Sequence, residues 1–486
     1  MARYQISEAQ IVPERNGFIN SSVDYPVQQS LSSFVKSILI VGAGLGGLGA
    51  AIALRLAGHN VTVLESAQEI GEVGAGIQVL PNSSKVLKSW GVFDKIDPSR
   101  ICTTDSCDIL GWKGQLISSM DFISAEKEYG SPFYDLHRAD LHKALFDRAM
   151  ELGAEVHVNS LVTDVRFDTD NNLAFVATKN GKEWQADLVV GADGLHSRCR
   201  AFILGKQDYP RRTGDMAYRL LLDGDEVRAD PELKPIVEDR AVTYWYGPGA
   251  HIVTYALRQR KLLNMVLLVP DDMPEDGPST LAGQVDEMQE LFKDWDPRVG
   301  KLLSKCKSVL RWRLSIWDPI ENWIHPSGCM VLLGDSVHAT LPYLASGAGM
   351  SFEDGAVLGH CLTGITKSAM KERRKALEVY QSCRMKRTNR IVEKGNIQQD
   401  INHYDDGPEQ SDRDQKMKAF EKLYEQDQRG ESLEWGNLKR GEDPLVWRKF
   451  GAGEWLLSYL PKEDVEKRRQ AGGFAAQEGG IDSARL

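Results

Sequence analysis

The first strongly apolar stretch of the chain is the run SILIVGAG, which begins at Ser37. An uninterrupted apolar run is typical of a strand that is buried on both faces of a parallel sheet. The next segment, LGGLGAAIALRLAGH, has the small and apolar residues of a buried helix closed by Gly58, and NVTVLESA indicates a second buried strand. This order predicts a β-α-β unit with two parallel strands.

The pattern changes between about residues 208 and 326, where apolar and polar positions alternate and aromatic residues are frequent. The segments AYRLLL, AVTYWYG, HIVTYALR, LLNMVLLVP and RWRLSIW show this alternation. Alternation is typical of antiparallel strands, so we expect a separate antiparallel sheet here and interpret it as a substrate domain. From 356 to about 460 the pattern is helical and charged, with a loop expected at YDDGPEQSDRD.

Composition narrows the classes of function. The 486 residues carry a formal net charge of −10 and no basic cluster, which argues against a nucleic-acid partner. The seven cysteines are scattered, with no CxxC pair and no histidines at zinc spacing, so we expect reduced cysteines, no metal site and an intracellular, cytoplasmic protein. The longest uncharged run, 38–54, is short and rich in glycine, and we therefore expect no membrane span.

Neither end of the chain has the pattern of a packed core. Residues 1–35 are polar and lack the layout of a signal peptide, so we expect a disordered leader. The segment FAAQEGGIDSARL predicts a flexible tail, and its last residues, Ala484-Arg485-Leu486, are similar to a small–basic–leucine peroxisomal address. A peroxisomal location is therefore a second expectation beside the cytoplasm.

A glycine motif occupies the turn between the first strand and the first helix. Gly42, Gly44 and Gly47 satisfy G-x-G-x-x-G, and Glu65 follows at the end of the second strand. Gly42 permits a tight turn, Gly44 the close approach of a pyrophosphate, and Gly47 the packing of helix on strand, while Glu65 can accept hydrogen bonds from a ribose. A purely structural glycine turn is the alternative. The motif predicts a dinucleotide site without separating NAD from FAD.

The second motif, ADLVVGADGLHSRCR, is a strand that ends in Asp193 and Gly194. The functional interpretation places Asp193 at a polar ligand and Gly194 where a side chain would collide with that ligand. The structural alternative is a capped turn before a short basic helix.

The third motif, GDSVHATLPYLASGAGMSFEDG, follows the buried strand CMVLL. Asp335 lies at the carboxyl end of that strand, where α/β sheets bind ligands, and its carboxylate suits the hydroxyls of a ribityl chain. Pro342, Gly347 and Ala348 lead into a helix whose positive end could stabilise a flavin that becomes anionic on reduction. The alternative is a structural turn with a satisfied aspartate.

In this order the three motifs resemble those of the class A flavoprotein aromatic hydroxylases, and the third is most similar to the salicylate hydroxylase-like branch, which includes fungal members. The resemblance covers about residues 36–460. HRADL matches a family position whose arginine, here Arg138, contacts FAD, and GEVGAGIQVLPNS, which contains Gly76, matches the segment that passes the flavin. The chain departs from much of the branch at 345–347, where Ala-Ser-Gly stands in place of Ala-Gln-Gly.

The resemblance implies an α/β plus antiparallel-β fold: a glutathione reductase-like, FAD-binding β-α-β domain with an inserted antiparallel-sheet substrate domain and C-terminal helices. We expect the FAD-binding domain in three parts, the substrate domain in two, and then the helices and tail. The expected boundaries are a leader at 1–35, FAD-binding parts at 36–107, 134–207 and 327–370, substrate parts at 108–133 and 208–326, a helical region at 371–465 and a tail at 466–486. The motif residues are all candidate FAD contacts under this resemblance.

The chemistry that the resemblance implies is reduction of non-covalently bound FAD by a transiently bound NADPH or NADH, addition of O2, and attack of an electron-rich ring on a C4a-hydroperoxyflavin. The expected substrate is a small phenolic or hydroxybenzoate-like molecule, with oxidative decarboxylation and dearomatisation left open. An electron-rich ring needs its phenolate favoured and water excluded. We expect a monomer or homodimer without a nucleic-acid partner.

Two residues are candidates for handling the substrate. Arg219, within MAYRLLL, could stabilise a phenolate or hold a carboxylate, and the family members that act on phenolic polyketides use an arginine at what resembles this position. The alternative is an edge-strand arginine with its head in solvent. Tyr246 is the best match for the partnering tyrosine among Tyr244, Tyr246 and Tyr255, and a core aromatic is its alternative.

Two histidines and two other classes of function remain to be weighed. His251 and His338 are more typical of structural than of catalytic histidines. A flavin reductase or dehydrogenase on the same scaffold is one alternative function. A non-catalytic escort protein with a flavoprotein fold is the other, and the three complete motifs argue against it.

Overall fold

A five-stranded parallel sheet begins the described chain, which in this computed structural model covers residues 37–71, 75–365 and 370–472. The strand order is β19-β12-β1-β2-β8. The strands are β1 (Ser37–Val41), β2 (Asn60–Leu64), β8 (Glu155–His157), β12 (Leu188–Gly191) and β19 (Met330–Leu332). The first two strands and α1 (Leu45–Leu56) form the predicted β-α-β unit. The expected leader at 1–35 and the tripeptide at 484–486 lie outside the described residues.

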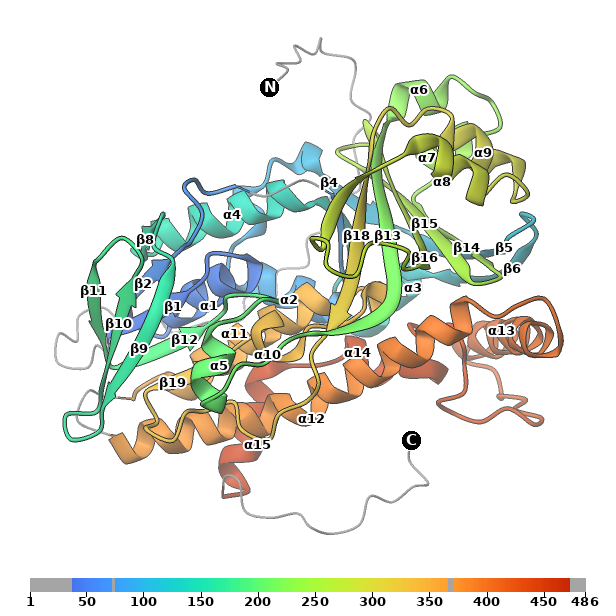
Figure 1. The fold of residues 1–486 in the computed structure, drawn as a ribbon. Helices are drawn as coiled ribbons and strands as arrows, with labels where there is room; N and C mark the ends of the chain where they lie inside the picture. Colours follow the sequence, from blue (N-terminus) through green and yellow to red (C-terminus); the bar gives the residue numbers. More distant parts are fainter. Residues whose placement is uncertain (1–36, 72–74, 366–369, 473–486) are drawn as a thin grey trace.

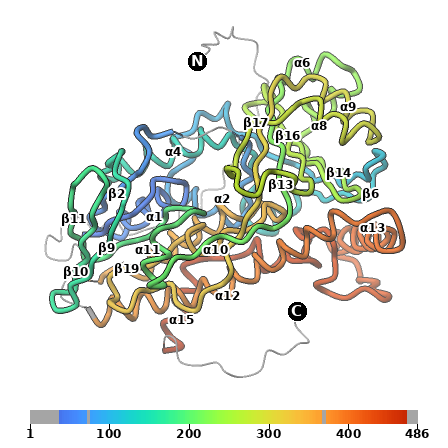
Figure 2. The backbone as a smooth tube through the Cα atoms, in the orientation of Figure 1, coloured from blue at the N-terminus to red at the C-terminus, as the bar shows by residue number. Residues whose placement is uncertain are grey.

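Helices from both ends of the described chain cover this sheet (Figure 1). Helix α1 packs on α11 (Gly347–Leu362), and a Cβ added at Gly355 or Gly359 would lie 3.0–3.1 Å from the backbone of α1. Small residues therefore allow these two helices to approach closely. Figure 2 shows the blue segment that contains α1 beside the gold segment that contains α11, although the two are far apart in sequence.

An eight-stranded sheet forms the second large layer, in the order β17-β18-β13-β16-β15-β14-β5-β6. Its strands are β5 (Ser106–Gly111), β6 (Leu116–Asp121), β13 (Arg211–Asp223), β14 (Ala241–Gly247), β15 (Ala250–Leu257), β16 (Leu262–Pro270), β17 (Thr280–Gly283) and β18 (Val309–Ile316). The predicted sheet is present and is antiparallel except where β14 pairs with β5 in parallel. It joins two separate stretches of the chain, 106–121 and 211–316. The proposed domain boundaries remain a prediction.

The two faces of this sheet have different neighbours. One face packs against four short helices, α6 (Gly224–Arg228), α7 (Lys234–Glu238), α8 (Val285–Leu291) and α9 (Pro297–Leu303). The other face carries Tyr244, Tyr246 and Tyr255 and packs against Leu344 and Met350, which lead into and lie in α11. We call this the inner face, because it looks toward the part of the chain that contains the parallel sheet.

Two small antiparallel sheets complete the strands. One has the order β3-β7-β4, with β3 (Gly76–Val79), β7 (Phe133–His137) and β4 (Ile101–Thr104), and β7 contacts β15 of the inner face. The other contains β9 (Val162–Asp168), β10 (Leu173–Thr178) and β11 (Glu183–Ala186). The helices between these strands are α2 (Pro81–Ser89), α3 (Phe122–Tyr129), α4 (Arg138–Glu151) and α5 (Cys199–Leu204), with short 3-10 turns at Phe93–Lys95 and Pro98–Arg100.

The C-terminal part is helical, as predicted. Helix α12 (Met370–Asn402) runs beneath both large sheets in Figure 1, and α13 (Pro408–Gln428), α14 (Glu454–Leu457) and α15 (Pro461–Gln470) follow it, with a π-helical turn at Lys449–Gly453. The loop predicted at 404–414 is wrong in its second half. Helix α13 begins at Pro408, since proline fits the first turn of a helix and Glu409 complements its positive end.

Three expectations drawn from composition concern a membrane span, the state of the cysteines and a metal site. Within the described ranges, no helix is long and apolar enough to cross a membrane. All seven cysteines are free thiols, and all but Cys102 are buried. The part of the chain that the structure describes holds no cluster of metal-ligating side chains.

Candidate functional site

The glycine turn holds two glycines that the protein itself requires and one that it does not. Gly42 has a φ of +104°, and a Cβ there would lie 2.4 Å from the Ala192 carbonyl oxygen. A Cβ at Gly47 would lie 2.0 Å from the carbonyl oxygen of Gly42. A Cβ at Gly44, at the N-cap of α1, meets no atom within 4 Å. Protein packing therefore does not explain Gly44, and the close approach of a pyrophosphate remains its predicted reason.

Glu65 closes one side of this turn. Its carboxylate accepts a hydrogen bond from the Ala43 backbone N–H at 2.8 Å and another from the Ala67 N–H at 2.7 Å. The side chain is half-buried, so it lies beside the open edge of the glycine turn. This placement suits a group that binds a ribose, which remains the predicted role.

The Asp193 carboxylate caps the turn that follows β12, as the structural alternative has it. One carboxylate oxygen accepts a hydrogen bond from Ser197 Oγ at 2.6 Å, and the other accepts the N–H groups of Arg198 and Cys199 at 2.7 and 3.0 Å. Gly194 has a φ of +74° and no atom within 4 Å of an added Cβ, so its backbone conformation already accounts for the glycine. A contact of either residue with FAD stays a prediction.

The third motif presents its ligand candidates at the ends of two helices. Asp335 is the first residue of α10 (Asp335–His338), directly after β19, and its side chain is exposed. Pro342 is the exposed first residue of a 3-10 turn (Pro342–Leu344), and Gly347 and Ala348 are the half-buried first residues of the 16-residue α11. The carboxyl edge of the parallel sheet and the positive end of α11 therefore lie in the same region.

A buried ionic network, which the sequence did not reveal, holds this motif. Asp354 accepts a hydrogen bond from the Gly334 N–H at 2.9 Å, contacts His338 Nε2 at 2.7 Å and pairs with Arg384 at 2.6 Å. Arg384 also pairs with Glu353 at 2.7 Å, and all three charged side chains are fully buried. Burial alone would raise the pKa of Asp354, but the charges of His338 and Arg384 hold it at about 2.

His338 therefore has a structural role, as expected, and so has His251. His251 Nδ1 contacts His403 Nε2 at 2.7 Å, and burial together with His403 lowers the pKa of His251. Near them Asp215 accepts a hydrogen bond from the Tyr343 hydroxyl. These groups come from β13, β15 and two distant loops, so only the folded chain brings them together.

Gly76 lies at the junction of the small β3 sheet and the inner face. Its N–H donates a hydrogen bond to Asn264 Oδ1 at 2.8 Å, and an added Cβ would lie 2.4 Å from the ring of Tyr255. The missing side chain therefore makes room for the eight-stranded sheet, which is a sufficient reason for glycine here. A contact of Gly76 with FAD stays a prediction.

Arg219 lies on the inner face, and the edge-strand alternative is wrong. Strand β13 pairs with β16 on one side and β18 on the other, so it is an interior strand. The Arg219 guanidinium carbon lies 4.6 Å from the centroid of the Trp312 ring, and its buried Nε has no hydrogen-bond partner among the described residues. Burial first, and then the charge of Arg138, lower the pKa of Arg219 to about 10. The predicted FAD contact and the predicted substrate contact are thus neighbours.

Tyr255, on β15, lies two strands from Arg219 and nearer to it in the sheet than Tyr246. The charge of Arg219 lowers the pKa of Tyr255 against the stronger effects of burial and Asp135, which raise it. Tyr246 lies on β14, three strands from β13 in the sheet order, or about 14 Å at ordinary strand spacing. It packs under Arg413, whose guanidinium carbon is 5.3 Å from its ring centroid, as the core-aromatic alternative has it.

Comparison with known proteins follows this geometry. Residues 36–395 match the FAD binding domain family. The FAD-dependent monooxygenase OpS4 of Beauveria bassiana is 39% identical over 80% of this chain and 90% of its own length. The 3-hydroxybenzoate 6-hydroxylase of Polaromonas naphthalenivorans is 33% identical over 73% of this chain and 85% of its own length.

Solved structures share the fold at lower identity. CtdE, determined with FAD and a substrate, has a TM-score of 0.73 at 22% identity and covers 90% of this chain and 98% of its own. A salicylate hydroxylase in a substrate complex has a TM-score of 0.68 at 20% identity, covering 89% of this chain and 97% of its own. The predicted combination of α/β and antiparallel-β layers is therefore confirmed.

Proposed function

Since the chain belongs to the FAD binding domain family and is an FAD-dependent aromatic hydroxylase, we propose that it uses NADPH or NADH and O2 to hydroxylate a phenolic or hydroxybenzoate-like ring. The observation that carries the proposal is Arg219. Its side chain is half-buried on the inner face of the sheet, its Nε is buried without a hydrogen-bond partner among the described residues, and the charge of Arg138 acts on it. A cation in this setting is suited to an anionic oxygen on a ligand.

The residues present suit FAD as the resident cofactor. Gly44 leaves open space at the positive end of α1, where a pyrophosphate is favoured, and Glu65 borders the same turn. Asp335 is exposed at the carboxyl edge of the parallel sheet, and α11 directs its N-terminus to the same edge. When bound, FAD supplies electron transfer from the nicotinamide and the activation of O2. We assign to FAD the remaining candidate contacts as well, namely Gly42, Gly47, Gly76, Arg138, Asp193, Gly194, Pro342, Gly347 and Ala348.

Arg219 and Tyr255 would handle the reacting oxygen of the substrate. The guanidinium favours the phenolate over the phenol, and a nearby positive charge in a site without water lowers the pKa of a phenol by roughly 1–3 units. The Tyr255 hydroxyl can donate a hydrogen bond to the same oxygen, because burial and the charge of Asp135 keep this tyrosine protonated by raising its pKa. A phenolate is the electron-rich form that the hydroxylation needs.

The rest of the inner face would exclude water from the ring. Its side chains around Arg219 are apolar, namely Ala217, Val253, Val266, Leu268 and Leu314. Removal of water strengthens the interaction between a guanidinium and a phenolate, because the local dielectric constant falls. The site therefore combines the Arg219 guanidinium with an apolar wall, which suits a flat aromatic ring with one ionisable oxygen.

A screen of hydroxybenzoates and larger phenols tests the proposal. The stimulated rate of NADPH or NADH oxidation, measured with oxygen uptake, identifies the substrate, and the mass of the product shows whether oxygen is added with or without loss of CO2. Turnover that persists without oxygen would support the flavin reductase or dehydrogenase alternative instead.

Variants of Arg219 test the site within the same assay. Arg219→Ala should slow hydroxylation by on the order of 10- to 1000-fold, as expected for a loss of 1–3 units of phenol pKa, while FAD stays bound. Arg219→Lys keeps the charge without the planar fork and should be intermediate. Hydroxylation by Arg219→Ala at the wild-type rate would remove this residue from the proposal.

A further inference from the structure

Asp135 is a buried carboxyl that the proposed chemistry has not used. It lies in the middle of β7, opposite Gln78 of β3 and Cys102 of β4 in register, and is only 3% exposed. One carboxyl oxygen accepts a hydrogen bond from the Thr104 hydroxyl, and the other, Oδ1, is buried without a hydrogen-bond partner in the described structure. A buried polar atom without a partner is costly and therefore needs an explanation.

Asp135 differs from most other buried carboxyl groups of the chain. Asp354, Asp296 and Asp140 each form an ion pair with arginine, at 2.6–2.8 Å. No ion pair is present at Asp135 among the described residues. Burial raises its pKa to about 7, against the hydrogen bonds of Thr104 and Gln78, which lower it. The carboxyl is therefore able both to gain and to lose a proton near neutral pH.

The inner side of Asp135 faces the tyrosines of the inner face. The Tyr244 hydroxyl donates to Gln78 Oε1 at 3.5 Å, and Gln78 is the cross-strand neighbour of Asp135. The charge of Asp135 also raises the pKa of Tyr255, on which the charge of Arg219 acts as well. The carboxyl thus lies behind the wall against which the substrate phenol would bind.

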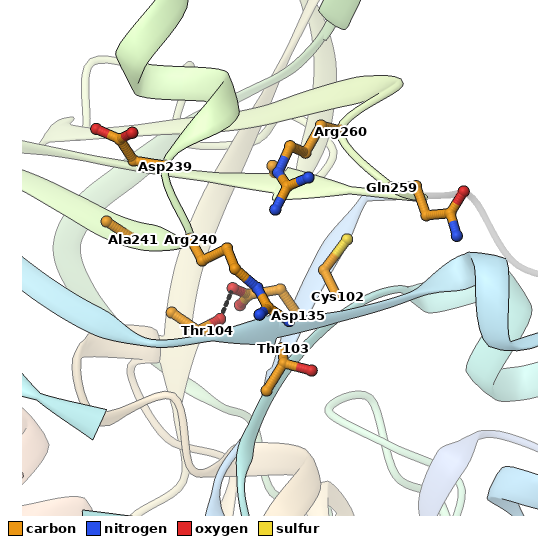
Figure 3. Close-up of a pocket in the computed structure, with 10 residues that line it drawn as sticks. Cys102, Thr103, Thr104, Asp135, Asp239, Arg240, Ala241, Gln259 and Arg260 are labelled. Carbon is orange, nitrogen blue, oxygen red and sulfur yellow. Dashed lines mark hydrogen bonds between the residues drawn. The ribbon is translucent and has the colours of Figure 1, made fainter. Parts of the chain in front are cut away.

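The outer side of Asp135 faces a small polar cavity of about 20 Å³, shown in Figure 3. Arg240, Gln259 and Arg260 border the same cavity as Asp135. A polar cavity of this size holds one water molecule. The titratable and charged groups around Asp135, taken over every element that packs against it, are Cys102, Cys107, Asp239, Arg240, Tyr244, Tyr255 and Arg260.

We propose that Asp135 is the proton acceptor of the hydroxylation, which takes the proton that the substrate phenol loses and passes it to water in the adjoining cavity. In this step the phenol O–H bond breaks, its electron pair stays on the oxygen opposite Arg219, and its proton goes to the Tyr255 hydroxyl oxygen. The Tyr255 hydroxyl gives up its own proton at the same time, and a new O–H bond forms on Asp135 Oδ1. The proton then leaves Asp135 for the cavity water and solvent, so the carboxylate is restored. The inference rests on the proposed function, since it needs a phenolic substrate.

Proton release on substrate binding tests this step without turnover. Oxidised, FAD-loaded protein is mixed with 3-hydroxybenzoate, salicylate or 4-nitrophenol in weakly buffered solution, and a pH-indicator dye follows the released proton by stopped flow. The change in the flavin spectrum reports ligand binding in the same experiment. Asp135→Asn, which has the same shape but accepts no proton, should slow proton release at least tenfold while the flavin spectrum still reports binding.

Two further variants separate this role from a structural one. Thr104→Val removes a hydrogen bond that lowers the pKa of Asp135, so the pH midpoint of proton release should shift upward from about 7. Asp187→Asn changes another buried carboxyl, which accepts the Ser37 N–H at 2.8 Å far along the parallel sheet, and should leave proton release unchanged.

The outcomes distinguish a failure of the role of Asp135 from a failure of the proposed function. Wild-type release rates in Asp135→Asn, or an unchanged midpoint in Thr104→Val, would overturn the role of Asp135 and leave the proposed function intact. If Asp135→Asn fails to fold, the Thr104→Val midpoint still decides. A wild-type protein whose flavin spectrum responds neither to these three phenols nor to the larger phenols of the screen would contradict the proposed function, and this inference with it.

Discussion

Replacement of Arg384 by methionine should destabilise the fold at the point that carries the third motif. Arg384 is fully buried and pairs with Asp354 at 2.6 Å and with Glu353 at 2.7 Å, both of which are also fully buried. Methionine fills much of the same volume but leaves two carboxylates without their shared cation. Asp354 also accepts a hydrogen bond from the Gly334 N–H, so the substitution should also destabilise the turn that contains Asp335.

The magnitude follows from what remains around the two carboxylates. Removal of one partner from a buried ion pair costs about 3–5 kcal/mol. Glu353 keeps Arg387 at 2.7 Å and Asn82 at 2.6 Å, and Asp354 keeps His338 at 2.7 Å. These partners place the expected loss at the lower end, about 3 kcal/mol, which for a chain of this length lowers the melting temperature by on the order of 3 °C.

Denaturant and thermal unfolding of Arg384→Met, followed by circular dichroism, measure this loss. Arg374→Met is the matched control, since Arg374 lies on the same helix in an exposed pair with Glu378 at 3.3 Å and should change the free energy of unfolding by less than about 0.5 kcal/mol. The deficit of Arg384→Met should shrink at acid pH, because the two carboxyls then become neutral. A variant as stable as the wild type at pH 7 would refute the reasoning.

Three other predictions concern the cofactor turn and two buried carboxyls. Gly44→Ala should fold normally and purify with little FAD. Gly47→Ala should lose both stability and FAD, because its Cβ would lie 2.0 Å from the Gly42 carbonyl oxygen. Melting curves and flavin absorbance distinguish the two variants. Asp354, with a folded pKa of about 2, stabilises the fold above about pH 4, and denaturant titrations should show that contribution lost as pH falls toward 2. Asp135, with a folded pKa of about 7, destabilises the fold as pH rises from 4 through 7, so the gain in stability of Asp135→Asn over the wild type should be larger at pH 8 than at pH 5.

Local patterns were enough to predict the parts of the site that lie along one stretch of chain. The strand, turn and helix around Gly42 follow from an apolar run and glycines within 20 residues, and the structure has them in that order. The alternation in MAYRLLL indicates that Arg219 shares a face with Ala217, and both lie on the inner face. Whether that face is buried depends on the strands beside β13, which no local pattern identifies.

Two of the features that sequence reasoning missed depend on pairing between distant segments. Tyr246 and Tyr255 fit the alternating pattern equally well, and only the strand order shows which lies near Arg219. Asp135 looks like an ordinary strand residue until β7 packs against the inner face. The helix that begins at Pro408 was obscured because its charged, proline-led sequence is also typical of a loop.

Incorporation of labelled oxygen tests the central claim most directly. The FAD-loaded protein, supplied with NADPH or NADH and the best phenol from the screen, is allowed to turn over under ¹⁸O₂ in ordinary water, and the product is analysed by mass spectrometry. The account predicts a product with one ¹⁸O atom on the ring and one nicotinamide oxidised for each hydroxylated molecule. A product without ¹⁸O, or a nicotinamide oxidation that continues without oxygen, would contradict it.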